Sequence, residues 1–383
     1  MFFYKIKVLL KAKYTFFPPK KKDILIYDAL SLKIISKIFL TKNFEIIHTR
    51  KEKINLFILL KTFLSFQFSF FDYLINYIKY SSAKLVITSM DNDMTFYKLK
   101  SRLPVLTIFF QNGARNVQED VFSILEKKIN FKNLRKKNHV DLMCTFNKIT
   151  GEKYKKFIKG ENFVSGSILG NEKKISNLKK NTLVYVSLYR PPERRKIPTE
   201  ERTFLKTVEK YCTEKKIKMI ILCKFYKGTI KGRQEYSFYK NNINQNSIII
   251  LNDPKRETFK ILDQSKLIVN IGSTLGFEAL ARKKRVALCH PYPLKDKKRG
   301  KKRFGYLSKK SKNGFFWHVG ISEKNIFKLF DRVINTSNSK WLSILKKNNE
   351  EVIYYDFKNF LLKQKLKKFL ALREKNLKKY IRN

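Results

Sequence analysis

The sequence predicts an α/β protein made of two Rossmann-like domains that face a cleft, followed by a helical C-terminus. Short apolar segments alternate with helical patterns in both halves of the 383 residues. Such alternation is typical of parallel sheets with right-handed crossovers. A polar stretch poor in core residues separates the halves, and the length suits two domains. We expect a first domain at 1–169, a linker at 170–181, a second domain at 182–335 and basic helices at 336–383.

The first half begins with an apolar strand that leaves a basic turn. Because residues 84–88 are continuously apolar, they indicate a strand buried on both faces of a parallel sheet. The strands are predicted at 22–28, 44–48, 84–88, 105–110 and 141–146, with residues 163–167 closing the half. The helices are predicted at 31–40, 55–80, from 96 to 100, and at 151–158.

The second half repeats this alternation, so it predicts a second parallel sheet. The strands are predicted at 183–189, 218–223, 247–251, 267–269 and 286–288. The helices are predicted at 199–214, 255–264 and 276–281, and the chain from residue 323 onward is mostly helical.

The charge of the chain is extreme, since 84 basic residues stand against 31 acidic ones and give a net charge of +53. Codon bias toward Lys, Asn, Ile, Phe and Tyr offers one explanation, and a selected anionic partner offers another. In either case the surface attracts nucleotides, acidic glycans, anionic lipid headgroups and nucleic acid. No nucleic-acid-binding motif is present, so specific nucleic-acid binding is not expected.

The four cysteines and four histidines are scattered, with no CxxC or HExxH spacing. This pattern predicts buried thiols of a reducing cytoplasm and no metal site. No signal peptide is expected at the N-terminus. Residues 54–78 are the most membrane-like stretch, but Lys61 and Asp72 interrupt it, so we expect a buried or amphipathic helix pair there.

The most informative loop is Gly272-Ser273-Thr274-Leu275-Gly276-Phe277-Glu278-Ala279, which follows an apolar strand and enters a helix. Ligands of open parallel sheets meet the loops at the carboxyl ends of strands. Gly272 allows a sharp turn. Ser273 and Thr274 near the N-cap, together with free helix N–H groups, can hold a phosphate. Glu278 lies one turn further on and can accept ribose hydroxyls. The alternative is an ordinary capped helix.

Two further strand ends carry polar residues. Asp91 and Asp93, on either side of Asn92, could supply a general base or bind sugar hydroxyls, although a helix-capping turn is equally possible. After the strand at 105–110, Asn112-Gly113 favours a turn with positive φ. The candidates for contact with a substrate in that loop are Gln111, Asn112, Gly113 and Arg115. A loop with a surface arginine is the alternative.

Two residues of the second half are weaker candidates. Arg190 ends the first strand of that half, and His290 closes a later strand just before Pro291. Both could contact a phosphate at the same edge as Ser273. A buried structural histidine is an equally good interpretation of His290.

Several of these segments resemble a bacterial family of surface carbohydrate (surface polysaccharide) biosynthesis proteins. The resemblance spans residues 20–335 and is carried by residues 24–28, 87–93 with 96–97, 110–115, 146–147, 166–168 and 270–279. Its most specific pieces are Gln111-Asn112-Gly113-Ala114-Arg115 and the segment 272–279. It implies a GT-B-like glycosyltransferase of cell-surface glycan synthesis. The glycine-rich loop that many GT-B enzymes carry in the first domain is not evident in this sequence.

The resemblance implies roles for the candidate residues. The second domain would bind a nucleotide-sugar donor through Gly272, Ser273, Thr274, Glu278 and, with them, Arg190 and His290. The first would bind a glycan or lipid-linked glycan acceptor, with Asp91 or Asp93 as the base and no cofactor beyond the nucleotide-activated sugar. A sugar-nucleotide epimerase on the same fold is the alternative, and a non-catalytic anion-binding protein is another.

A peripheral position on the inner face of the plasma membrane is also predicted. Residues 361–383 form a basic amphipathic helix pattern, and residues 295–312 form a strongly basic loop. Both are typical of docking on anionic lipid. The alternative for the helix is that it packs back on the first domain.

Overall fold

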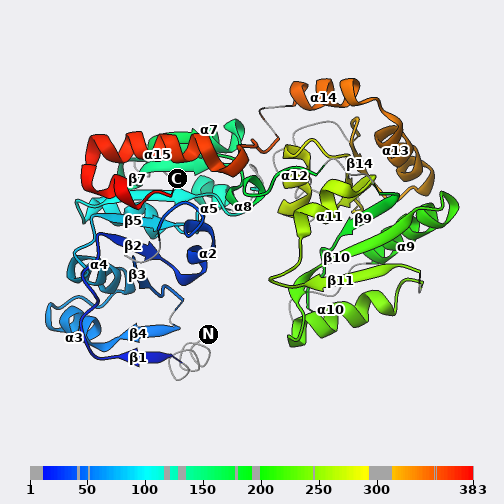
Figure 1. Cartoon of the computed structure of the whole chain (residues 1–383). Coiled ribbons are helices and arrows are strands. Elements are labelled where there is room, and N and C mark those ends of the chain that lie inside the picture. Colours follow the sequence, from blue (N-terminus) through cyan, green and yellow to red (C-terminus); the bar gives the residue numbers. More distant parts are fainter. Residues whose placement is uncertain are drawn as a thin grey trace. The chain divides into compact units, whose positions relative to one another are not determined.

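The computed structural model describes residues 12–40, 44–50, 52–115, 121–127, 135–176, 180–191, 199–244, 246–292, 313–348, 350 and 352–382. These form two compact units (Figure 1). Unit 1 takes the described residues of 1–112, 121–172 and 356–383. Unit 2 takes those of 113–120 and 173–355. The chain therefore returns to unit 1 at its C-terminus. The basic loop predicted at 295–312 lies outside the described residues.

Unit 1 is built on a parallel sheet of six strands in the order β3-β2-β5-β6-β7-β8. The strands are β2 (Ile24–Tyr27), β3 (Phe44–Ile47), β5 (Leu85–Thr88), β6 (Leu106–Phe110), β7 (His139–Thr145) and β8 (Lys159–Val164). β2 and β5 are buried along their whole length because helices cover both faces of the sheet. The strand order reverses between β2 and β5, and open α/β sheets bind ligands at such a reversal.

The helices of unit 1 are mostly short. They are α2 (Leu32–Ile35), α3 (Leu56–Leu64), α4 (Phe70–Tyr80), α5 (Val121–Lys127), α7 (Lys148–Phe157), α8 (Ile168–Asn171) and α15 (Phe360–Arg373), with the 3-10 turn η3 at Phe96–Ser101. A parallel pair of short strands, β1 (Lys13–Thr15) and β4 (Lys53–Asn55), lies apart from the main sheet and beside α3.

The C-terminal helix α15 belongs to the core of unit 1. Its side chains Leu362, Leu366, Phe369 and Leu370 are buried in one cluster with strands β2, β5, β6 and β7. Leu377 and Ile381, which follow the helix, join the same cluster. The apolar face that the sequence offered to a membrane is therefore occupied by the sheet, and the prediction that this face docks on lipid is wrong.

Unit 2 is built on a second parallel sheet of six strands, in the order β11-β10-β9-β12-β13-β14. The strands are β9 (Thr182–Val186), β10 (Lys218–Tyr226), β11 (Ile248–Asn252), β12 (Leu267–Asn270), β13 (Val286–His290) and β14 (Trp317–Val319). This is the strand order of the dinucleotide-binding Rossmann fold, whose reversal lies between the first and fourth strands. In unit 2 these two strands are β9 and β12.

The helices of unit 2 follow its strands in alternation. They are α9 (Thr199–Glu214), α10 (Ile230–Lys240), α11 (Thr258–Gln264), α12 (Thr274–Ala281), α13 (Glu323–Asn335) and α14 (Asn338–Lys347). The predicted fold class, two Rossmann-like α/β units with a helical C-terminus, is confirmed.

The helix pair expected at 54–78 is present, whereas another helix was not expected. The pair is separated at Phe66, which has a positive φ of 54°, and Ser69 caps α4 through the N–H of Asp72. The helix at Ile230–Lys240 was not predicted, since it has little amphipathic pattern. Among the described residues, no helix is long and apolar enough to cross a bilayer.

Candidate functional site

The strand-order reversal of unit 2 places the β12–α12 loop where a ligand of this fold binds. Asn270, the last residue of β12, folds this loop. Its Nδ2 donates to the Ser273 carbonyl at 3.1 Å, and its Oδ1 accepts from the Ser273 N–H at 3.0 Å. The loop is thus fixed by one buried side chain, which the sequence motif had not singled out.

Gly276 allows helix α12 to lie against this asparagine. A Cβ at position 276 would come within 2.2 Å of the Asn270 side chain. Because real Cβ contacts are never so short, only glycine fits here. The third glycine of dinucleotide-binding loops allows a similarly close approach of helix and strand.

Gly272 differs from Gly276 in its surroundings. Its φ is not in the left-handed region, so the predicted sharp turn is not the reason for a glycine at this position. A Cβ at position 272 would meet no atom within 4 Å. The exposed backbone of Gly272 therefore borders open space beside the start of α12.

The N-terminus of α12 has a backbone N–H group that can donate to a ligand. Ser273 is the N-cap, and its hydroxyl accepts from the Leu275 N–H at 3.4 Å. Among the described residues, no acceptor is found for the Thr274 N–H. The amide dipoles of the helix add a partial positive charge at this end. These groups together suit an anion.

The Thr274 hydroxyl has a structural partner. It accepts the N–H of Ala114 at 3.0 Å, and Gly113 lies in contact with it. Residues 113–115 group with unit 2, so the structure brings two of the predicted loops together. Gly113 does not have the positive φ that we predicted for it. Arg115, in the same segment, is partly buried.

Three other predicted residues of unit 2 differ in exposure. β9, β12 and β13 are neighbours in the sheet, so the residues that follow them share one edge. Arg190 follows β9 and is exposed. His290 ends β13 with only 2 % of its surface exposed, and its ring packs edge-on against Tyr292. Glu278 is buried on α12.

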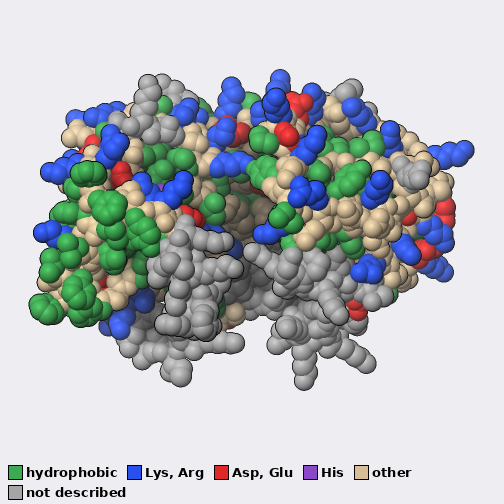
Figure 2. Space-filling model, turned by 90° about the horizontal axis from the view of Figure 1, so that it is seen from below, with side chains coloured by type: hydrophobic (Ala, Val, Ile, Leu, Met, Phe, Trp, Pro, Cys, Tyr) green, Lys and Arg blue, Asp and Glu red, His purple; other side chains and the backbone are tan. Residues whose placement is uncertain are grey.

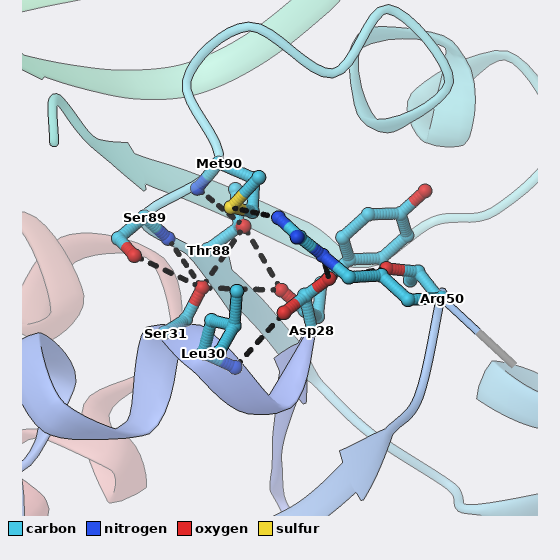
Figure 3. A network of polar contacts seen from close by, with 9 residues as sticks. Asp28, Leu30, Ser31, Arg50, Thr88, Ser89 and Met90 are labelled. Atoms are coloured by element: carbon cyan, nitrogen blue, oxygen red, sulfur yellow. Dashed lines mark hydrogen bonds and ion pairs between the residues drawn. The ribbon is translucent and has the colours of Figure 1, made fainter. Parts of the chain in front are cut away.

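The strand-order reversal of unit 1 carries a polar network that the sequence analysis missed (Figure 3). Asp28 follows β2 with a φ of 82°, and its carboxylate is almost fully buried. It accepts hydrogen bonds from the Leu30 N–H at 2.8 Å, the Thr49 hydroxyl at 2.7 Å and the Arg50 Nε at 3.0 Å. An aspartate directly after the first strand was the sequence feature that could have revealed it.

Hydroxyl groups complete this network between β2 and β5. Ser31 accepts from the Ser89 N–H at 2.8 Å, and Thr88 donates to the Tyr27 carbonyl at 2.9 Å (Figure 3). The Met90 N–H in turn donates to the Thr88 hydroxyl at 2.9 Å. The two strand ends are therefore joined by side chains, and the loop from Met90 onward leaves a rigid base.

Asp91 has the geometry of a structural residue. It is completely buried, and its carboxylate accepts from the Tyr154 hydroxyl at 2.7 Å and from the Asn112 N–H at 3.1 Å. A general base needs an oxygen within reach of a substrate. In this structure the Asp91 carboxylate holds the loop at Asn112, and its catalytic role stays a prediction that the exposure of Asp93 fits better.

Asp93 and Asn92 are more accessible than Asp91. Asn92 is exposed, and Asp93 is partly exposed. One oxygen of Asp93 accepts from the Thr95 N–H at 2.8 Å. Burial, and then the charge of Asp93 and its hydrogen bond, raise the pKa of Tyr27, so Tyr27 stays a protonated donor to this carboxylate.

Gln111 and Asn112 also differ in their exposure to solvent. Gln111 is buried, and its Oε1 accepts from the Phe146 N–H at 2.8 Å, which joins the ends of β6 and β7. Gln111 therefore has a structural contact in this structure, and its contact with a substrate stays a prediction. Asn112 is exposed and keeps its side chain at the surface.

The cysteines and the other residues that could bind a metal are scattered over the described parts of the chain. Within them, no group of three or more His, Cys, Asp or Glu residues could hold a metal ion. All four cysteines are free and buried. Burial raises the pKa of each thiol, so none is a thiolate near neutral pH.

Solved structures share the fold of this chain. The wall teichoic acid polymerase TagF matches with a TM-score of 0.52 and 9% identity, covering 93% of this chain and 91% of that one. UDP-GlcNAc 2-epimerase of Methanocaldococcus jannaschii, solved with UDP-GlcNAc and UDP, matches with a TM-score of 0.51 and 12% identity, covering 92% and 99%. MnaA of S. aureus, solved with UDP, matches with a TM-score of 0.51 and 14% identity, covering 92% and 97%.

At these identities the likeness establishes the GT-B type of fold alone. A comparison with curated proteins finds no match. A family model described as "putative O-antigen biosynthesis protein" matches residues 108–370, which is more than half of the chain. The predicted resemblance to surface-polysaccharide biosynthesis proteins is confirmed, and the chain belongs to this family of O-antigen biosynthesis proteins.

Proposed function

We propose that the protein is a glycosyltransferase of surface-polysaccharide synthesis. It transfers a sugar from a nucleotide-activated donor to a glycan acceptor. Membership of an O-antigen biosynthesis family supports the pathway. The GT-B type of fold supports a nucleotide-sugar substrate, since two of the matching structures were solved with UDP.

The observation that carries the proposal is the built loop between β12 and α12. It combines a helix N-terminus, an N–H of Thr274 without an acceptor among the described residues, and open space over Gly272. It also lies at the strand-order reversal, where Rossmann folds hold the phosphates of nucleotides. We assign it to the donor diphosphate.

Other residues of unit 2 complete the proposed donor site. Arg190 and Arg115 carry permanent positive charge that would stabilise the leaving phosphate as the glycosidic bond breaks. His290 would contact the same phosphate at the end of β13. Glu278 would accept hydroxyls of the ribose. The nucleotide-activated sugar is itself the substrate, and the proposal needs no further cofactor.

Asp93 is the proposed general base in unit 1. It would take the proton of the acceptor hydroxyl while that oxygen bonds to the anomeric carbon of the sugar. The bond between this carbon and the phosphate oxygen breaks, and the nucleotide leaves as the anion. Asn92 and Asn112, which are exposed, would bind acceptor hydroxyls.

Filling the space over Gly272 tests the donor site directly. A Cβ at position 272 meets no other atom within 4 Å, and Gly272→Val places a side chain where the phosphate would lie. We expect calorimetry with a panel of UDP, CDP, GDP and CMP sugars to show a Kd at least about tenfold higher for the bound donor. An unchanged Kd in a folded variant would remove the donor assignment.

A pair of cap variants provides a matched control. Ser273 caps α12 and Ser337 caps α14 in the same unit. Replacing either by alanine costs about 0.5–2 kcal/mol of stability. We expect only Ser273→Ala to weaken donor binding. Equal weakening in both variants would mean that lost stability, not a lost ligand contact, explains the effect.

An epimerase is the alternative activity, because one matching structure is a UDP-GlcNAc 2-epimerase. An epimerase converts the nucleotide sugar with no acceptor present. A transferase releases the nucleotide only in proportion to acceptor glycosylated. Product analysis with and without a glycan acceptor therefore separates the two activities.

A further inference from the structure

Helix α3 of unit 1 exposes most of its large apolar side chains to solvent. Its outward side chains are apolar, since Leu59, Leu60, Phe63 and Leu64 are between 47% and 62% exposed. Its fully buried residues are one apolar and one polar, Ile58 and Thr62, and the Thr62 hydroxyl accepts from Asn76 of α4 at 3.0 Å. A surface helix of a water-soluble protein has the opposite arrangement, with the apolar stripe facing the core.

The apolar surface extends beyond this helix. The turn between α3 and α4 carries Phe66, 86% exposed, and Phe68, 73% exposed. Phe16 and Phe17 are 69% and 83% exposed, and the Phe17 carbonyl accepts from the side chain of Asn55, the N-cap of α3. Figure 2 shows hydrophobic side chains gathered over this end of unit 1. We call these residues of 16–17 and 59–68 the phenylalanine patch.

A pocket opens within the phenylalanine patch. It has a volume of about 350 Å³, and its lining is mainly apolar, with Leu59, Phe63 and Phe68 among the residues that form it. Lys53 and His48 also line it. Its size and lining suit a segment of hydrocarbon chain with an anionic group near the lysine.

Basic residues lie beside the patch. Lys13 and Lys53 are direct neighbours on the strand pair β1–β4, which contacts α3, and both are exposed. Lys61 is exposed on α3 itself. Asp72 of α4 is paired with Arg102 at 3.3 Å. Glu52 is exposed next to Lys53, and the set remains net positive.

We propose that the phenylalanine patch docks on the surface of an anionic lipid bilayer. Aromatic and leucine side chains enter the boundary between headgroups and acyl chains, while lysines contact the lipid phosphates. Helix α3, with nine residues, is far too short to span the bilayer, so it lies at the interface. Charge complementarity selects a lipid surface, and the inference does not depend on the transfer activity.

The first test separates insertion from electrostatic attraction. The net charge of +53 attracts anionic vesicles by itself, but added salt screens such attraction. The full chain is sedimented with phosphatidylcholine vesicles, with and without phosphatidylglycerol, at low and high salt. We expect Phe66→Asp with Phe68→Asp to lower partitioning into phosphatidylglycerol vesicles at least tenfold at high salt.

Leu361→Asp with Leu372→Asp is the matched control, because it adds the same two negative charges at exposed leucines of α15. Leu372 lies on α15 of the same unit and is 87% exposed, as Phe66 is 86% exposed. We expect this variant to bind vesicles as the wild type does. Equal loss in both variants would overturn the proposal, because added negative charge alone would then explain it. Thermal unfolding checks that each variant is folded.

A second measurement reports insertion directly. Tryptophan fluorescence of a Phe66→Trp variant is recorded with vesicles whose acyl chains carry bromine, against the wild type, whose two tryptophans are buried in unit 2. We expect quenching of the added tryptophan and a blue shift. No quenching, or a vesicle-free dimer that Phe66→Asp with Phe68→Asp dissociates, would overturn the proposal.

Discussion

At the scale of single residues, the two glycines at the start of α12 have opposite surroundings. Gly276 faces the Asn270 side chain, whereas Gly272 faces open space. We expect Gly276→Ala to lower the free energy of unfolding of unit 2 by about 1–3 kcal/mol, the usual effect of overpacking. We expect Gly272→Ala to leave it nearly unchanged. Urea titration of both variants measures the difference, and equal values would contradict it.

Substitutions of Asp91 and Asp93 are likewise expected to have different effects, because the surroundings of the two side chains differ. Asp91→Asn turns an N–H₂ group toward the Tyr154 hydroxyl or the Asn112 N–H, both of which donate to the carboxylate. The loss of a buried acceptor costs about 1–3 kcal/mol of stability. Asp93→Asn should cost less stability, because this side chain is partly exposed and the amide keeps one oxygen for the Thr95 N–H, and it should lower kcat about 10²- to 10⁴-fold. Denaturation and turnover of both variants test this; full turnover in Asp93→Asn would move the base elsewhere.

The sequence located these residues but could not assign their roles. Polar residues that follow buried strands are visible in sequence, and the sheet does bring them to its carboxyl edge. Which atoms remain available depends on distant partners. The Tyr154 hydroxyl donates to the Asp91 carboxylate, and the Ala114 N–H donates to the Thr274 hydroxyl. No local pattern contains a contact between residues so far apart in the chain.

At the scale of elements, α15 shows how an amphipathic helix can be misread. Its apolar face is completely buried against the sheet of unit 1. We expect Leu366→Ala to lower the free energy of unfolding by about 2–5 kcal/mol. Leu372→Ala, on the exposed face of the same helix, should change it by less than about 0.5 kcal/mol. Chemical denaturation compares the two variants. An unchanged free energy of unfolding in Leu366→Ala would show that α15 does not belong to the core.

The pattern of α15 is the same whether the partner is a sheet or a lipid surface, since both bury an apolar stripe. Sequence therefore predicts the stripe and not its partner. The stretch at 55–80 shows the converse. It was expected to be a buried or amphipathic helix pair, and it does form two helices. Yet the outer side of α3 is apolar, and a polar contact between Thr62 and Asn76 lies on its inner side. The sequence pattern did not show which side of the helix faces the protein.

At the scale of the whole molecule, alternation of strands and helices was enough to predict two parallel-sheet units. The strand orders were not predictable, because they depend on which crossovers go to which side of the first strand. Unit 1 places its second strand at the edge, whereas unit 2 places its third strand there. The candidate sites nevertheless follow the strand orders, since each lies at the reversal of its own sheet.

The histidines give the whole molecule a common response to pH. Burial lowers the pKa of His48, His139 and His318 in the folded protein, from an ordinary value of 6.5. The folded state therefore favours the neutral ring, while the unfolded chain takes up protons first as the pH falls. The stability that these rings contribute is present above about pH 6.5 and is lost as the pH falls through the lowered pKa values.

We expect the free energy of unfolding to fall between about pH 7 and pH 5 for this reason. His318 provides the test, because Arg332 nearby lowers its pKa in addition to burial. His318→Gln cannot take up the proton, so its stability should depend less steeply on pH than that of the wild type. Urea titrations at several pH values give the two slopes. Identical slopes would mean that carboxyl groups, not His318, carry the pH dependence of this part of unit 2.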